Sequence, residues 1–152
     1  MFELTLQVGP SDIDELGHLN NVRYVQWVQD VAVAHSASIG LDWAAYAKMR
    51  GVFVLRRHEA DYLRSILVGA ELRARTWLGN KRGVQVDRYI EFFEGDALVF
   101  KSMTRWVYID LDAQKPARIP VAVFEAFAAS FEPPPEYSAG QPGPGVRQRA
   151  AQ

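Results

Sequence analysis

The sequence contains no cysteine among its 152 residues. This absence excludes disulfide bonds, thiolate metal ligands and a cysteine nucleophile, and it is compatible with a reducing compartment. Long apolar runs are lacking too: none approaches the roughly 18 residues that cross a bilayer, so no membrane insertion is expected. The first residues alternate like a strand and include Glu3, unlike a secretion signal. We therefore expect a cytoplasmic protein.

An excess of charge of either sign is also missing. Seventeen basic residues stand against 18 acidic residues, so the formal net charge is -1 and no nucleic-acid partner is expected. The apolar fraction of 49% is ordinary for a globular protein. We expect one domain over residues 1–131. Residues 132–152 are rich in proline and glycine and poor in apolar side chains, which predicts a disordered tail.

Two hydrophobic periodicities organise the domain. Apolar and polar residues alternate over residues 2–8, which predicts a strand. Apolar residues recur every three or four positions over residues 22–39, which predicts a long helix capped by Asn20 or Asn21. A shorter helical stretch, 43–49, follows.

The second half of the domain is predicted to be mainly β structure. Its strands are expected over residues 52–63, 71–78, 84–92 and 97–111. Glycine-containing turns at 79–83 and 94–96 predict an antiparallel meander. A short helix is expected over residues 121–130. One helix inserted early in an antiparallel sheet predicts an α+β fold in which the sheet curls around that helix. One face of the sheet stays uncovered, so we expect a dimer or a larger assembly.

The polar segment before the long helix is the part that points to chemistry. It carries three carboxylates, a histidine and two amides, namely Asp12, Asp14, Glu15, His18, Asn20 and Asn21. A helix N-terminus has free N–H groups and partial positive charge, so it can stabilise a developing oxyanion. A carboxylate beside it can act as a nucleophile or activate a water.

This segment resembles hotdog-fold thioesterases of the 4-hydroxybenzoyl-CoA thioesterase type, which include bacterial acyl-CoA thioesterases. The residues that match in order and spacing are Asp14, Gly17, His18, Asn20, Asn21 and Tyr24. The motif is also similar to one in plant acyl-ACP thioesterases, although Leu16, Ser65 and Ala70 depart from the plant pattern. The resemblance covers about residues 3 to 130 and implies a hotdog fold.

The resemblance also implies roles for individual residues. Asp14 takes the place of the catalytic carboxylate, and a backbone N–H near Tyr24 would polarise the thioester carbonyl. His18 matches a functional histidine of the plant-like group, with orientation of the loop as the alternative role. Gly17, Asn20 and Asn21 are placed on the substrate side, with capping and bracing as the alternative for the two asparagines.

Other residues are also candidates. Lys81 and Arg82, at an expected hairpin tip, are candidates for binding the phosphates of CoA. Asp12 is the competing carboxylate, and its expected role is to brace the turn. His35 and His58 lack a second ligand at metal spacing, so both are interpreted as structural, and neither a metal nor a redox cofactor is expected.

The sequence thus predicts a thioesterase of lipid metabolism that hydrolyses an acyl-CoA or acyl-ACP thioester. A homodimer or homotetramer, with sites at the subunit interface, is implied by the resemblance. Two alternatives stay open: a hydratase or dehydratase on the same fold, and a non-catalytic acyl-CoA-binding protein. The acyl group itself is not specified.

Overall fold

The computed structural model describes residues 1–136, so most of the predicted tail lies outside the described residues. The strands are β1 (Phe2–Gln7), β2 (Gly51–Tyr62), β3 (Glu71–Arg82), β4 (Gln85–Glu94), β5 (Ala97–Asp110) and β6 (Lys115–Pro116). The helices are α1 (Asn21–Ser38), α2 (Trp43–Met49) and α3 (Val121–Phe127), with 3-10 turns η1 (Pro10–Asp12) and η2 (Ala128–Ser130).

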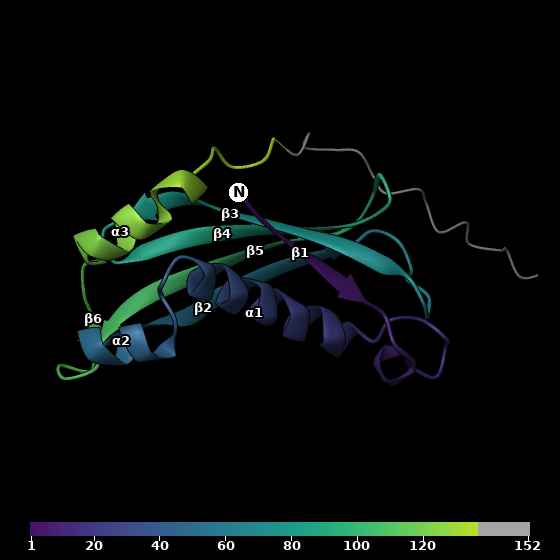
Figure 1. Cartoon of the computed structure of the whole chain (residues 1–152), viewed down its shortest axis with the longest axis horizontal. Helices are drawn as coiled ribbons and strands as arrows, with labels where there is room; N and C mark the ends of the chain where they lie inside the picture. The colour runs from purple at the N-terminus through teal and green to yellow at the C-terminus, as the bar shows by residue number, and fades with distance from the viewer. Residues whose placement is uncertain (137–152) are drawn as a thin grey trace, which may run out of the picture.

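The strands form one antiparallel sheet in the order β1-β3-β4-β5-β2, and β6 pairs with β5. The sheet curves along α1, which covers one of its faces (Figure 1). At one end of α1 lies the loop that follows η1, and at the other end lie α2 and α3 (Figure 1). The predicted α+β architecture, a curved antiparallel sheet against one long helix, is confirmed.

The apolar face of α1 explains why the helix lies on the sheet. It buries Tyr24, Trp27, Val28, Val31, Ala32 and His35. These side chains meet sheet residues such as Leu72, Ile90 and Phe92, each almost fully inaccessible to solvent. Each large apolar side chain buried in this way stabilises the fold by about 1.5–3 kcal/mol. Packing against the sheet therefore positions α1 and the loop before it.

The predicted helix ends are largely confirmed. Asn20 is the N-cap of α1, because its Oδ1 accepts a hydrogen bond from the N–H of Val22 at 2.9 Å. After α2, the left-handed residue is Arg50 rather than a glycine. Gly51 is instead the first residue of β2, where a Cβ would collide with the ring of Tyr108. Close packing, not turn geometry, requires that glycine.

Two boundaries differ from the sequence-based expectation. The expected turn over 79–83 is mostly strand, because β3 continues to Arg82 and a shift in register after Gly79 absorbs the extra residues. Packing also extends slightly past residue 131. The N–H of Glu132 bonds the carbonyl of Leu78 at 2.9 Å, and Trp77 Nε1 donates to the carbonyl of Pro133 at 3.3 Å.

Candidate functional site

The loop between η1 and α1 is closed by its own backbone. The N–H of Asp14 donates to the carbonyl of His18 at 2.8 Å, and Gly17 donates back to the Asp14 carbonyl at 3.1 Å. Gly17 has φ +78°, a conformation that glycine adopts without strain. Leu19 anchors the loop to the body of the protein through a 2.8 Å bond from its N–H to the Ile66 carbonyl. The loop is therefore a defined platform for side chains.

The Asp14 carboxylate has one occupied and one available oxygen. Its Oδ1 accepts hydrogen bonds from the N–H groups of Leu16 at 2.9 Å and His18 at 3.2 Å. Within residues 1–136, Oδ2 has no hydrogen bond and the side chain forms no ion pair. One oxygen thus fixes the orientation of this half-buried carboxylate while the other remains free to react.

Both carboxylate oxygens of Asp12 have partners. Its Oδ2 accepts from the N–H of Gly9 at 2.9 Å, and its Oδ1 lies 2.6 Å from Nε of Arg23. The side chain is buried. These contacts agree with the interpretation that Asp12 braces the turn, and they leave Asp14 as the carboxylate of this loop with a free oxygen and some burial.

The first turn of α1 has one uncommitted N–H group. Val22 is capped by Asn20, and the N–H of Arg23 bonds the Asn20 carbonyl at 2.9 Å. The N–H of Asn21, the first helical residue, has no acceptor within the described chain and none is available inside the helix. Tyr24 sits one turn further on, where an N–H belongs to the helical hydrogen-bond ladder.

The Tyr24 ring belongs to the core rather than to a cleft. It is 3% exposed and packs edge-on against Tyr62, with ring centroids 4.9 Å apart. Burial, and then the neighbouring Tyr62 hydroxyl, raise the pKa of Tyr24 to about 12. The phenol therefore stays neutral near neutral pH.

The other predicted residues are divided between the two ends of the molecule. His18 is half-buried beside Asp14, and its ring forms no hydrogen bond within residues 1–136, so its contribution to the loop comes from its backbone. Lys81 and Arg82 are the last residues of β3, and Lys81 contacts Phe124 of α3. The loop before α1 and the helix α3 lie at opposite ends of α1 (Figure 1). Lys81 Nζ lies 3.3 Å from the ring centroid of Phe124, so it is held over an aromatic face.

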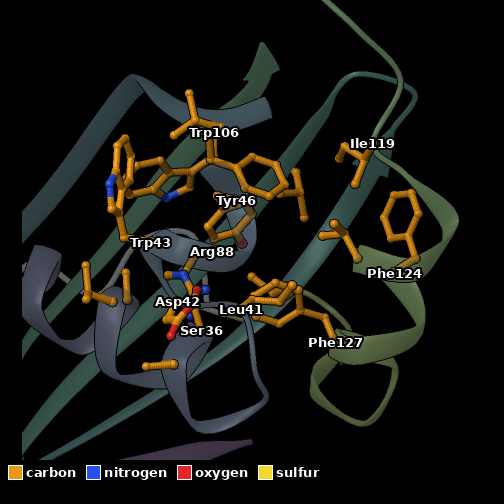
Figure 2. A pocket seen from close by; sticks show the side chains of 18 of the residues that line it. Ser36, Leu41, Asp42, Trp43, Tyr46, Arg88, Trp106, Ile119, Phe124 and Phe127 are labelled. Carbon is orange, nitrogen blue, oxygen red and sulfur yellow. The ribbon is translucent and has the colours of Figure 1, made fainter. Parts of the chain in front are cut away.

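A cavity of about 280 Å³ opens at that far end, between α1, α2, α3 and the sheet. Figure 2 shows aromatic and aliphatic side chains around it, among them Trp43, Tyr46, Trp106, Ile119, Phe124 and Phe127. Asp14 does not line it. Gln29 is the first α1 residue of the lining, and from Asn21 to Gln29 the helix rises about 12 Å at 1.5 Å per residue. Within one chain, the Asp14 carboxylate therefore lies outside the cavity.

A buried polar cluster lies at the inner end of the cavity. Arg88, 4% exposed, donates from Nη1 to Nδ1 of His35 at 2.8 Å and to Oγ1 of Thr76 at 3.0 Å. His35 Nε2 lies 2.9 Å from Oγ of Ser130. Burial, followed by the Arg88 charge, lowers the pKa of His35 to about 3, so the imidazole is neutral. This arrangement supports the structural interpretation of His35.

The sequence analysis did not single out Arg88, which lines the cavity, although a signal was present. It occupies an inward position in the alternating run of β4, between Val86 and Ile90. Arginine is usually exposed, so an arginine in an apolar series is informative.

Metal-binding clusters and membrane-spanning helices are both absent from residues 1–136. That part of the chain holds no group of three histidine or acidic side chains placed to bind a metal ion. Nor does any of its helices combine the length and apolar character needed to cross a bilayer.

Solved structures share this fold at low sequence identity. A 1,4-dihydroxy-2-naphthoyl-CoA thioesterase from Synechocystis is 18% identical, with a TM-score of 0.76 over 84% of this chain and 95% of that one. A DHNA-CoA thioesterase from Staphylococcus aureus is also 18% identical, with a TM-score of 0.74 over 84% and 88%. A Staphylococcus aureus protein solved in complex with CoA is 15% identical, with a TM-score of 0.82 over 93% and 95%.

Sequence comparison identifies the family. No curated protein sequence matches this chain. Residues 8–129, which include the Asp14 loop, all of α1 and strands β2 to β5, match the thioesterase-like superfamily. The chain therefore belongs to the thioesterase-like superfamily and is a thioester hydrolase with a hotdog fold.

Proposed function

We propose that this protein hydrolyses acyl-CoA thioesters with Asp14 as the reacting carboxylate. The observation that carries the proposal is that Asp14 has a free carboxylate oxygen and that the helix directly after its loop begins with an uncommitted N–H. The resemblance pointed to an amide near Tyr24, whereas the hydrogen bonds of the first turn favour the N–H of Asn21. That N–H would polarise the carbonyl and stabilise the oxyanion.

Two routes use these groups. In one, Oδ2 of Asp14 attacks the thioester carbonyl, the CoA thiolate leaves, and water then hydrolyses the resulting mixed anhydride. In the other, Asp14 accepts a proton from a water that attacks the same carbon, and the leaving thiolate takes up a proton. Both routes yield the free acid and CoA thiol, and both need the carbonyl oxygen at the helix N-terminus.

CoA is the proposed carrier of the acyl group. Structures of the same fold include thioesterases for CoA esters and a protein in complex with CoA, which supports CoA over an acyl-carrier protein. Lys81 and Arg82 are the proposed contacts for CoA phosphates. They stand at the same end of the molecule as the cavity, since Lys81 contacts Phe124 in its lining.

A homodimer would unite the reacting carboxylate with the cavity. β2 is an edge of the sheet, and its full antiparallel pairing with a second β2 would set Tyr62 of one chain opposite Gly51 of the other. Tyr62 packs on Tyr24 near the start of α1, and Val52, next to Gly51, lines the cavity. Asp14 of the partner subunit would therefore approach the cavity.

Exposed apolar side chains support the same interface. On α1 and β2 these are Val22, Val25, Val33, Val54, Leu55 and Tyr62. Val22 is 71% exposed although it belongs to the helix that fills the centre of the fold. Burying such side chains against a second copy would remove them from water. We propose that the dimer forms through this face.

The test is thiol release from a panel of acyl-CoAs by full-length protein. Asp14→Asn keeps an oxygen that can accept from Leu16 and His18, so the loop should remain folded. We expect turnover to fall by about 10²–10⁴-fold. Glu15→Gln, which neutralises the exposed neighbouring carboxylate, is the matched control and should retain turnover.

Near-normal turnover by Asp14→Asn on the best substrate would reject the assignment. The same assay separates hydrolysis from the alternatives, because neither hydration of an enoyl-CoA nor binding without turnover releases a thiol.

A further inference from the structure

Arg88 is a buried cation without a counter-ion. Within residues 1–136 none of the ion pairs involves it, although it is 96% shielded from solvent. Its neighbours His35 and Thr76 are neutral acceptors. Removing a guanidinium from water costs several kcal/mol unless a charge of opposite sign compensates it. An anion is the group that this position lacks.

The free edge of the guanidinium is the one that recognises carboxylates. Nη1 uses its two hydrogens on His35 and Thr76. Nε and Nη2 have no acceptor in the described chain, yet both keep some accessible surface, and Arg88 lines the cavity. Two parallel N–H groups on one edge match the two oxygens of a carboxylate. His35 and Thr76 thus leave the Nε and Nη2 edge of Arg88 available for a bidentate contact.

No group of the cavity lining supplies that negative charge. Asp42 is the acidic residue of the lining, but it is exposed at the rim and its Oδ1 caps α2 by accepting from Ala45 at 2.8 Å. Burial raises the pKa of the Tyr46 hydroxyl, so this group of the lining stays neutral. Figure 2 shows Arg88 and Asp42 among otherwise mostly apolar side chains.

The size and lining of the cavity limit the kind of group that could carry a carboxylate to Arg88. A cavity of roughly 150 Å³ holds a benzene molecule, so the observed volume of about 280 Å³ has room for a substituted ring. Trp43, Tyr46, Phe53 and Trp106 contribute aromatic surface to the lining. Such surfaces favour a flat ring, which can stack or meet them edge to face.

We infer that the cavity binds an aromatic acyl group that carries a carboxylate at its far end, with that carboxylate on Arg88. This inference rests on the proposed function, because it names the substrate class of the same site: the mono-CoA thioester of an aromatic dicarboxylic acid. The thioester end would face the rim, where Trp43 and Val33 are exposed and where Asp14 of the partner subunit would approach.

The test compares two CoA thioesters of the same shape, 4-carboxybenzoyl-CoA and 4-methylbenzoyl-CoA. The full-length protein should prefer the carboxylate by roughly tenfold or more in kcat/KM, since a charge-assisted hydrogen-bond pair is lost with the methyl compound. Arg88→Met should abolish that preference while changing hydrolysis of 4-methylbenzoyl-CoA only a few-fold. Arg73→Met, the same change at an exposed arginine of β3, should leave the preference intact.

Each other outcome is decisive. Equal or better hydrolysis of the methyl compound by the unmodified protein overturns the inference and leaves the proposed function standing. If neither thioester is hydrolysed, the wider acyl-CoA panel decides the proposed function, and calorimetry with 4-carboxybenzamide and 4-methylbenzamide tests whether the cavity selects a carboxylate. Tighter binding of the carboxylate supports the inference, and equal binding overturns it. If Arg88→Met does not fold, calorimetry with the two benzamides still tests the inference, because it uses the unmodified chain.

Discussion

Nη1 of Arg88 donates to Nδ1 of His35 over 2.8 Å, inside the protein. A guanidinium offers only donors, so this contact fixes the acceptor on Nδ1 and the proton on Nε2, which then donates to Oγ of Ser130 at 2.9 Å. A second proton on His35 would break the contact with Arg88 and place two cations together. The pair therefore couples the stability of the fold to pH.

Acid should destabilise the protein through His35. Its pKa is lowered from 6.5 to about 3 by burial and by Arg88, so the folded state resists a proton that the unfolded chain accepts. The stabilisation is complete above pH 6.5 and is lost as pH falls from 6.5 toward 3, at about 1.4 kcal/mol per pH unit for this one group. Urea unfolding measured at intervals between pH 7 and 4.5 checks the slope.

His35→Asn is the matched variant, because the amide oxygen can replace Nδ1 as the acceptor for Arg88 without titrating. The free energy of unfolding of this variant should change less steeply with pH, by the contribution of about one proton. His58→Asn is the comparison variant, because His58 is a half-buried imidazole whose pKa is also lowered by burial. An unchanged slope in His35→Asn would contradict the coupling.

The β2 edge should control assembly and turnover together. Leu55 is exposed on this edge strand, so Leu55→Glu would place a charge in the proposed interface. We expect the variant to be monomeric in sedimentation, folded by circular dichroism, and at least about tenfold slower in thiol release, because desolvating an unpaired charge is unfavourable. Val121→Glu, an exposed change on α3, should leave assembly unchanged. A Leu55→Glu dimer with normal turnover would argue against the shared site.

The Asn20 cap should stabilise the start of α1 by a measurable amount. Asn20→Ala removes the acceptor for the Val22 N–H, which should lower the free energy of unfolding by about 1 kcal/mol. Asn20→Asp keeps a capping oxygen and should stay close to the unmodified protein. Chemical denaturation at pH 7 distinguishes them, and equal losses in both variants would assign the effect to something other than the cap.

Local patterns predicted much of the architecture because they depend on neighbours in the chain. The three-to-four-residue period over 22–39 predicted α1, and Asn20 was correctly expected among its caps. The turn at 79–83 was predicted too long, since a glycine and a left-handed Asn80 fit a bulged strand as well as a turn. Which of the two forms depends on pairing with β4, and pairing is not a local property.

For the candidate site, the sequence by itself determined the platform: a carboxylate loop, an N-cap and a helix, all within about ten residues. Only the tertiary structure decided which groups on that platform are free. Arg23 reaches back to occupy Asp12, whereas the Asp14 carboxylate is held by backbone N–H groups alone. The roles that Lys81 and His18 have in substrate binding or catalysis stay predictions.

The cavity and its cation are a property of the fold. The alternating run of β4 determined that Arg88 shares a face with Ile90. It did not determine that His35 from α1 would bind Arg88 there, or that Ser130 from η2 would bind His35. Those contacts join residues 53 and 95 positions apart in the chain. Sequence periodicity sets which side of an element is buried, because it follows from local backbone geometry. What that side meets depends on how the helices pack on the sheet, and only the folded chain decides this.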